Sequence, residues 1–261
     1  MQIEKKTARA QASGALQPIA TTVETVIDHN VPFQIYVGHE LARKPKSGVI
    51  PVAGAKNPFL PPYEDDLYVG SIPPSHECLI NKFPVLPAHA LVVTREFEPQ
   101  TDSLTRADCE ALAYCLAEGD ALAFYNCGAE AGASQPHKHM QLVRMSTQLP
   151  MVRAFEQGRL PFLSYFARLQ PTADEIFHHL SVGLRKVLSG SNSAFNLIAA
   201  RDWLALIGRG AECFEDISVN ALGFAGTFFV RSPAQLGRLI SVGPTEVLRQ
   251  VAFSTSATRF G

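Results

Sequence analysis

The stretch GASQPHKHMQLV, residues 132–143, decides the fold prediction because it repeats polar side chains at every second position. His137, His139 and Gln141 are separated from one another by single residues. Successive side chains of a β-strand point to opposite faces, so these three share one face. Of the three side chains that alternate with them, two are apolar. The stretch therefore predicts a strand with one largely buried face and one face that lines a site.

Three kinds of chemistry suit such a row of side chains. Imidazoles at positions i and i+2 can reach one metal ion, although Gln141 is a poor zinc ligand and further ligands would be needed. Two partly exposed histidines can also form hydrogen bonds for structural reasons alone. The third chemistry is nucleophilic attack on phosphorus by an imidazole. The pattern by itself leaves all three open.

Attack on phosphorus makes demands that the neighbouring loop can meet. The attacking imidazole needs one neutral ring nitrogen, with its other nitrogen held by a hydrogen bond. Donors must also stabilise charge on the phosphoryl oxygens. Backbone amides of a small-residue turn suit this role, and AEAGAS, residues 129–134, directly precedes the histidines. Gly132 and Ala133 allow close approach of the backbone, and Ser134 and Gln135 add side-chain donors.

The rest of the chain predicts strands and helices in an irregular order. Strands are expected at residues 31–38, 122–128 and 222–230, with two more inside 76–97 and a hairpin at 195–209. Helices are expected at residues 104–121, 171–190 and 243–253, the last of them beginning at Pro244. In the first of these helices, Thr105 and Asp108 stand at the spacing of a capping box. Mixed strands, hairpins and helices favour the α+β class with a mostly antiparallel sheet.

Two segments are expected to lack regular structure within a single domain of residues 1–261. Residues 1–25 are predicted to be flexible. Residues 42–62 are basic and Pro-rich, because the segment LARKPKSGVIPVAGAKNPFLPP, residues 41–62, contains five prolines and three lysines. Proline removes a hydrogen-bond donor and restricts the residue before it. This loop is either simply solvated or a mobile basic flap over an anionic ligand.

The composition excludes some classes of partner. Of 261 residues, 46% are hydrophobic, and 23 basic against 24 acidic side chains give a net charge of −1. This balance predicts no broad basic face for nucleic acid, although a local cluster would suffice for a small anion. The sequence has no run of about 18 apolar residues, so no membrane span is predicted. The charged start lacks a following apolar core, so no secretory signal is expected.

The cysteines indicate a reducing compartment. The chain has five, without a C-x-x-C pair and with apolar neighbours. Such cysteines are typical of buried thiols in the cytoplasm. A zinc ribbon is excluded on the same grounds, and no metal site built from protein ligands is predicted.

The sequence segments around the histidines resemble those of a known family. Their order and spacing are those of the diadenosine tetraphosphate phosphorylases, also called ATP adenylyltransferases: NKFPVLPAHALVVT (81–94), QTDSLT (100–105), FYNCG (124–128), GASQPHKHMQ (132–141) and FNLIAARDW (195–203). The resemblance spans about residues 30–250. The family it points to is part of the nucleotidyltransferase branch of the histidine-triad superfamily. The resemblance therefore implies a histidine-triad-like fold with helices flanking the sheet.

The resemblance implies a role for each residue of the motif. His139 would be the nucleophile that takes AMP as a covalent phosphoramidate. His137 would support and orient it, and Gln141 would contact the phosphoryl oxygens. Further substrate-binding residues are implied on the loop and the preceding strand: Asn126, Gly132, Ala133, Ser134 and Gln135.

Other implied substrate contacts lie outside the motif. Asn81 and Lys82 match the family's Asn-Lys pair, and Lys44 matches a basic residue of its loop, where an incidental surface lysine is the alternative. The carboxyl-terminal matches are looser. Relatives carry a more polar Asn-Ser-Thr type segment where this chain has Asn220, Ala221 and Leu222. They carry a methionine where this chain has Thr227 and a lysine where it has Arg231. Arginine keeps the charge of lysine but changes the geometry.

The implied activity is reversible adenylyl transfer. Diadenosine tetraphosphate and inorganic phosphate would give ATP and ADP through AMP on His139. No tightly bound cofactor is implied, and magnesium would come with the polyphosphate. The sequence does not predict an oligomeric state.

Three alternatives stay open at this stage. A histidine-triad hydrolase carries a third histidine where this chain has Gln141, and an amide cannot trade protons with a leaving group. A sugar-1-phosphate uridylyltransferase shares the motif but fits the flanking words poorly. A nucleotide-binding sensor without activity would not need an intact nucleophile.

Overall fold

The strand that carries the motif lies inside an eight-stranded sheet. The computed structural model describes residues 3–38, 57–117, 119–145, 149–188 and 193–255. In it, β7 (His139–Val143) lies between β5 (Ala90–Thr94) and β6 (Leu122–Cys127). The strand order is β3-β4-β5-β7-β6-β9-β10-β8, and every neighbouring pair is antiparallel. The other strands are β3 (Tyr68–Ile72), β4 (His76–Ile80), β8 (Ser164–Arg168), β9 (Phe195–Ala200) and β10 (Trp203–Gly208).

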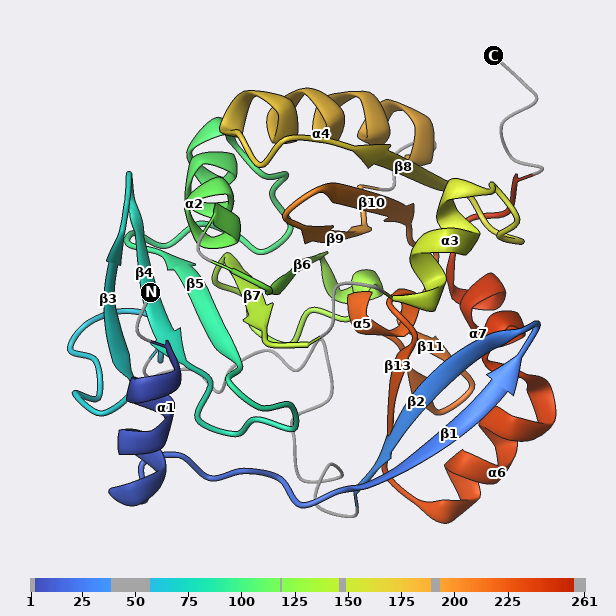
Figure 1. The fold of residues 1–261 in the computed structure, drawn as a ribbon, viewed down its shortest axis with the longest axis horizontal. Helices are drawn as coiled ribbons and strands as arrows, with labels where there is room; N and C mark the ends of the chain where they lie inside the picture. The colour runs from blue at the N-terminus through green and yellow to red at the C-terminus, as the bar shows by residue number, and fades with distance from the viewer. Residues whose placement is uncertain (1–2, 39–56, 118, 146–148, 189–192, 256–261) are drawn as a thin grey trace.

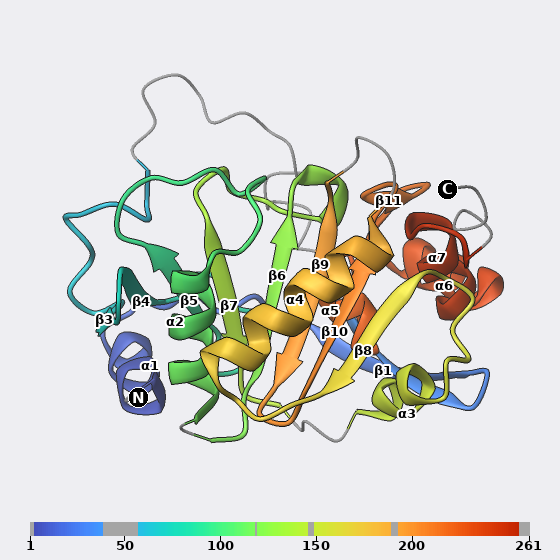
Figure 2. The same cartoon turned by 90° about the horizontal axis from the view of Figure 1, so that it is seen from above.

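Two helices cover one face of this sheet. In Figure 2, α2 (Arg106–Ala117) and α4 (Ala173–Val187) lie side by side across the strands. Met140 and Leu142 of β7 point to this face and join a core with Leu112 of α2 and Leu180 of α4. The apolar half of the alternation in the motif is therefore buried as predicted.

The opposite face is covered in part by a second, three-stranded sheet. It consists of β1 (Thr22–Asp28), β2 (Val31–Val37) and β13 (Thr227–Val230), with β13 parallel to β2 (Figure 1). Phe124 of β6 and Phe228 of β13 share the core between the two sheets. Around it lie the remaining elements: η2 (Ala129–Ala131), α3 (Pro150–Glu156), β11 (Cys213–Phe214), β12 (Ile217–Ser218), α5 (Ala221–Phe224), α6 (Pro233–Val242) and α7 (Pro244–Val251).

Several sequence-based predictions are confirmed. The architecture is α+β with a mostly antiparallel main sheet, as expected. The strands expected within 76–97 are β4 and β5, the hairpin at 195–209 is β9 and β10, and the last helix begins at Pro244. The capping box is also present, since Thr105 N donates to Asp108 Oδ2 and Asp108 N donates to Thr105 Oγ1.

Three expectations differ from the structure. The segment 222–230 is not one strand, because Asn220 Oδ1 accepts from Leu222 N and starts α5, so that β13 begins only at Thr227. Within residues 1–25, Ile3–Ala12 forms α1 against β3 and β4, and Ala10 is fully buried there. The helix expected to reach Gly190 ends at Val187.

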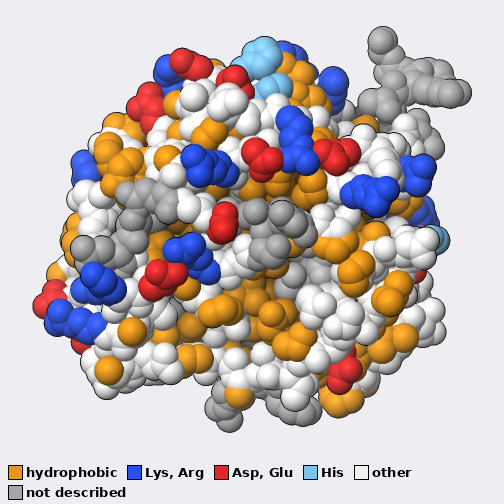
Figure 3. All heavy atoms as spheres, viewed as in Figure 1, with side chains coloured by type: hydrophobic (Ala, Val, Ile, Leu, Met, Phe, Trp, Pro, Cys, Tyr) orange, Lys and Arg blue, Asp and Glu red, His pale blue; other side chains and the backbone are white. Residues whose placement is uncertain are grey.

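The surface agrees with a chain of balanced charge. On the face shown in Figure 3, basic and acidic side chains are interspersed. Of the helices that the structure describes, none combines the length and apolar character needed to span a bilayer.

Candidate functional site

The second histidine of the motif is buried and keeps one ring nitrogen available. His139 is 4% exposed, and its Nδ1 donates to the carbonyl of His137 at 2.8 Å. This bond places the proton on Nδ1, so Nε2 carries the lone pair. No residue in the described part of the chain hydrogen-bonds Nε2. Burial lowers the pKa of His139 to about 4, so the imidazole is neutral at physiological pH.

The first histidine has both ring nitrogens engaged. Nε2 of His137 donates to the carbonyl of Thr94 at 2.8 Å, and Nδ1 accepts from Asn57 Nδ2 at 2.9 Å. The side chain is fully buried, and burial lowers its pKa. Neither nitrogen can attack a substrate or bind a metal without breaking these bonds. The structure therefore separates two residues that the sequence pattern treats alike.

A single aromatic ring confirms that the two imidazoles share a face. The Phe59 ring centroid lies 5.0 Å from that of His139 and 5.8 Å from that of His137. Asn57 Oδ1 accepts from Phe59 N, which holds this segment in place over the histidines. Residues 57–62 are the end of the Pro-rich loop. Residues 42–56 of that loop, including Lys44, lie outside the described residues.

The residue between the histidines belongs to the opposite face. Lys138 is buried, and its Nζ contacts the carboxylates of Glu98 and Asp108. Asp108 also accepts from Nε2 of His76 at 2.8 Å. Contact with these carboxylates raises the pKa of Lys138 although burial opposes it. This buried charge is thus neutralised behind the strand, away from the imidazole of His139.

The amide of Gln141 is oriented by a third histidine. Asn81 Nδ2 donates to Nδ1 of His89 at 3.1 Å, so the proton of His89 lies on Nε2. Nε2 then donates to Gln141 Oε1 at 2.9 Å. With its oxygen occupied, Gln141 presents Nε2 as a donor to its surroundings. Asn81, predicted as a substrate contact, acts in this structure as the support of His89.

The small-residue loop packs against the turn that starts α5. Gly132 has φ +85°, and a Cβ atom there would lie 2.8 Å from the carbonyl oxygen of Val219 and 3.0 Å from Cα of Asn220. Only glycine permits both this backbone conformation and this approach. The structure thus brings together two predicted site segments that are separated by almost ninety residues in the chain.

Asn126 joins these segments from within. Its Oδ1 accepts from Ala221 N and from Asn196 Nδ2, both at 2.9 Å. Asn196 also donates to the carbonyl of Ala131. Buried Arg209 donates to Asn196 Oδ1 and to the carbonyls of Ala131 and Val219. Asn126 is 2% exposed, so its carboxamide oxygen shapes the loop from beneath.

The other predicted contacts are spread over a wider area. Ser134 is exposed, Gln135 is partly exposed and Ala133 is buried. Lys82 Nζ donates to Glu64 at 2.7 Å. Leu222 is buried in the core, Thr227 is buried on β13, and Arg231 follows that strand and hydrogen-bonds Gln235 through its backbone N. The roles of the last three side chains stay predictions.

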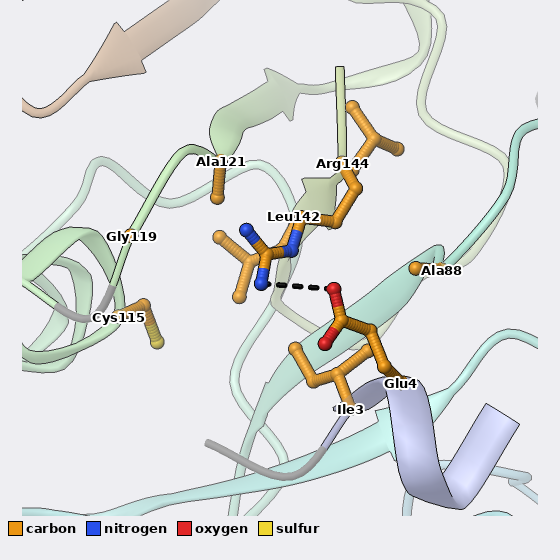
Figure 4. A pocket seen from close by; sticks show the side chains of 9 residues that line it. Ile3, Glu4, Ala88, Cys115, Gly119, Ala121, Leu142 and Arg144 are labelled. Carbon is orange, nitrogen blue, oxygen red and sulfur yellow. Dashed lines mark ion pairs between the residues drawn. The ribbon is translucent and has the colours of Figure 1, made fainter. Parts of the chain in front are cut away.

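Two cavities in the described part of the chain lie away from these residues. One of about 40 Å³, between α1 and the end of β7, is crossed by an ion pair between Glu4 and Arg144 (Figure 4). A larger one of about 620 Å³ lies between α3 and the start of α7. None of the residues predicted for the site lines either cavity. In the described ranges, no group of three or more His, Cys, Asp or Glu side chains could hold a metal ion.

Sequence reasoning missed three residues of the site. His89, Arg209 and Gln100 are not among the site residues predicted from the sequence. Gln100 is the first residue of the segment QTDSLT, residues 100–105. Its Oε1 accepts from His139 N at 2.7 Å. No spacing rule connects these residues with the motif, because each reaches it through a tertiary contact.

Fold and site together define a class of protein. A mostly antiparallel sheet that presents one available imidazole, followed two residues later by an oriented amide, fits the histidine-triad nucleotidyltransferase that the sequence resemblance implies. Comparison with known proteins identifies the family. The Ap4A phosphorylase N-terminal domain matches residues 1–157, and the ATP adenylyltransferase C-terminal domain matches residues 158–254.

Known proteins from yeast are similar over most of the chain. Diadenosine 5',5'''-P1,P4-tetraphosphate phosphorylase 2 of Saccharomyces cerevisiae is 30% identical, and the match covers 82% of this chain and 70% of that protein. Protein APA1 of the same organism is 25% identical, and the match covers 88% of this chain and 86% of that protein. The chain belongs to the Ap4A phosphorylase family.

Solved structures agree with the fold. The crystal structure of yeast Ap4A phosphorylase Apa2 has a TM-score of 0.79 at 22% identity and covers 97% of this chain and 96% of its own. Its complex with AMP gives a TM-score of 0.81, with 98% and 97% covered. Strands from both family-model matches share the eight-stranded sheet, since β3 to β7 precede residue 158 and β8 to β10 follow it.

Proposed function

We propose that this chain converts diadenosine tetraphosphate and inorganic phosphate into ATP and ADP through a covalent AMP on Nε2 of His139. One observation carries the proposal: the bond from His139 Nδ1 to the carbonyl of His137 leaves Nε2 with a lone pair. The relatives support the substrate, because one is named a diadenosine tetraphosphate phosphorylase and Apa2 has been solved with Ap4A and with AMP.

The reaction proceeds as two displacements at one phosphorus. Nε2 of His139 attacks the α-phosphorus, a P–N bond forms, and the P–O bond to the departing ATP breaks. An oxygen of inorganic phosphate then attacks the same phosphorus, the P–N bond breaks, and ADP leaves. Splitting the exchange in this way lets one site serve both half-reactions, in either direction.

The surrounding donors would stabilise charge on the transferred group. Gln141 would donate from Nε2 to a phosphoryl oxygen, and the backbone amides of the loop from Gly132 to Gln135 would hold the polyphosphate. Lys82 would exchange Glu64 for phosphate, since both side chains are partly exposed. Magnesium would be bound by the phosphates of the substrate.

The acceptor is expected to be an anion rather than water. An amide at Gln141 cannot take a proton from an attacking water, whereas inorganic phosphate arrives already deprotonated.

The five cysteines are free thiols, four of them buried, which supports the reducing cytoplasm as the place of this reaction.

The first test is to incubate the purified protein with diadenosine tetraphosphate, with and without inorganic phosphate, and to separate the nucleotides. ATP and ADP that appear only with phosphate support the proposal. ATP and AMP formed without phosphate would make the chain a hydrolase and refute the inference from Gln141.

The covalent step needs its own measurement. Without phosphate, intact-protein mass spectrometry should detect an addition of one AMP, which acid removes. His139→Ala should form none, whereas His178→Ala, which changes a histidine on helix α4, should form as much as the unchanged chain. A chain that binds the dinucleotide but never forms the adduct would be a sensor.

A further inference from the structure

The main sheet is split beside the candidate nucleophile. β6 and β7 pair from Leu122 with Val143 to Phe124 with Gln141 and then stop. Both strands continue beyond this point, because β6 runs to Cys127 and β7 begins at His139. The same antiparallel register, carried two residues further, would place Asn126 opposite His139. The ladder therefore ends one hydrogen-bonded pair short of the site.

A side-chain amide fills the place of the missing pair. Gln100 Oε1 accepts from His139 N at 2.7 Å, and its Nε2 donates to the carbonyl of Asn126 at 2.8 Å and to that of His139 at 3.3 Å. These are backbone groups that a continued ladder would have joined directly. A carboxamide offers the same donor and acceptor as a peptide, so it can bridge strands that stand too far apart to pair.

The backbone of Gln100 is itself fixed to both sides of the split. Its N donates to the carbonyl of Pro136 at 2.8 Å, and its carbonyl accepts from Gly128 N at 3.1 Å and from the Tyr125 hydroxyl at 3.0 Å. The residue is 3% exposed. One buried glutamine thus contacts the strand of the histidines on one side and, on the other, β6 and the first residue of the loop that follows it.

This split has a geometric consequence for the reaction. His139 lies on β7, while the loop around Gly132 follows β6. Direct pairing of Asn126 with His139 would draw the two strands to the usual spacing of a ladder. The amide of Gln100 keeps them apart at the point where a phosphoryl group must fit between the imidazole and the loop.

We propose that Gln100 is a positioning residue: its side-chain amide, inserted between the strands, sets the separation of His139 from the phosphate-binding loop. The proposal rests on the proposed function of His139. It assigns Gln100 no contact with the substrate, because both polar atoms of its side chain hydrogen-bond the backbone of Asn126 and His139.

The conservative variant Gln100→Glu separates positioning from packing. A carboxylate keeps the size and can still accept from His139 N, but it has no hydrogen to donate to the carbonyls of Asn126 and His139. Thr172→Ala is the matched control, since it removes a side-chain cap from α4, which lies on the other face of the sheet. Both variants lose a buried or capping hydrogen bond, but only one loses it beside His139.

The experiment measures phosphorolysis rates at a temperature where circular dichroism reports every variant as folded. For Gln100→Glu, kcat is expected to fall about 100-fold while KM for the dinucleotide changes less, because displacement of a reacting group costs that much. Thr172→Ala should keep the kcat of the unchanged chain. Equal kcat values for the two variants would overturn the proposal.

A second readout does not depend on activity. Hydrogen exchange at the backbone amide of His139 should speed up in Gln100→Ala, which removes the acceptor of this amide, and stay unchanged in Thr172→Ala. If the unchanged chain shows no phosphorolysis, the proposed function fails, and the exchange at His139 still decides whether Gln100 fixes this strand. Exchange that stays slow in Gln100→Ala would refute the structural link as well.

Discussion

The carbonyl oxygen of His137 lies 2.8 Å from Nδ1 of His139 and accepts a hydrogen bond from it. The first histidine of the motif therefore orients the second through its backbone, not through its ring. The ring of His137 has a separate task, because it ties β7 to Thr94 and to Asn57. Support thus comes from the backbone and ring of His137, and the available ring nitrogen belongs to His139.

Alanine at either position should have different consequences. His139→Ala removes the nucleophile and should lower phosphorolysis by a factor of about 10,000 or more. His137→Ala leaves the carbonyl in place and should still form the AMP adduct, but it should lower the free energy of unfolding by about 3 kcal/mol because it empties a buried site and strands the partners of the ring. Adduct formation and urea unfolding of both variants check this pair of expectations.

Phe59 provides a check on the same pair. Its ring contacts both imidazoles, so any loss of packing in Phe59→Ala affects them together. If His137→Ala abolished the adduct while Phe59→Ala preserved it, the ring of His137 would have a chemical role that its two hydrogen bonds do not explain.

The lowered pKa of His139 predicts a pH dependence of stability. Burial lowers this pKa from its ordinary 6.5 to about 4, so the unfolded chain binds a proton there more readily than the folded chain does. The contribution is complete above pH 6.5 and is lost as the pH falls toward 4. Between pH 7 and pH 5, the free energy of unfolding should therefore fall by about 2 kcal/mol through this residue.

Urea titrations of the unchanged chain and of His139→Gln at several pH values measure this difference. The variant lacks the titrating group, so its free energy of unfolding should depend less steeply on pH in this window. Parallel curves for the two proteins would mean that His139 is not buried as described.

Local patterns in the sequence carried much of the fold. The repeat of polar residues at a spacing of two predicted that His137 and His139 share one face, and the Phe59 contacts confirm it. The capping box of Thr105 and Asp108 was predictable for the same reason, because both partners lie within one helical turn. Where geometry is fixed by neighbours in the chain, the sequence is sufficient.

Tertiary contacts set the limit of that reasoning. Asn126 was expected to face the substrate, yet its Oδ1 is bound by the backbone of Ala221, 95 residues away. The apolar segment after Asn220 predicts a strand, but Asn220 caps a short helix there instead. Its apolar character comes from burial on all sides, a pattern that helix and strand share.

The hydrogen bond from His89 to Gln141 predicts that the effects of changing these two side chains on kcat are coupled. His89→Phe keeps an aromatic ring but removes the donor that fixes Gln141 Oε1, so the amide can turn its oxygen toward the phosphate. We expect kcat to fall about tenfold. Gln141→Ala should cost more, and His89→Phe added to it should cost little further.

A double-mutant cycle on kcat measures this coupling. Additive losses would show that His89 acts independently of Gln141. Asn81→Ala tests the other end of the chain, because it removes the donor that holds the proton of His89 on Nε2. Its effect on kcat should resemble that of His89→Phe in size and direction.

Two glycines offer a test of the phosphate-binding loop. Gly132 and Gly14 both have positive φ, +85° and +77°, but only Gly132 has other backbone close to its missing Cβ. Gly14→Ala should therefore cost about 1 kcal/mol of stability from its backbone conformation alone, with unchanged activity. Gly132→Ala should cost about 3 kcal/mol, because its Cβ would lie 2.8 Å from the carbonyl oxygen of Val219.

The clash at Gly132 should also displace the loop from the imidazole. We expect KM for the dinucleotide to rise about tenfold in Gly132→Ala, since a displaced loop loses contacts with phosphate in both the ground state and the transition state. Thermal unfolding and steady-state kinetics of both variants give the two numbers. Equal stability losses for Gly14→Ala and Gly132→Ala would mean that the loop and the turn at Asn220 do not pack as closely as described, and the contact between these two distant segments would have to be abandoned.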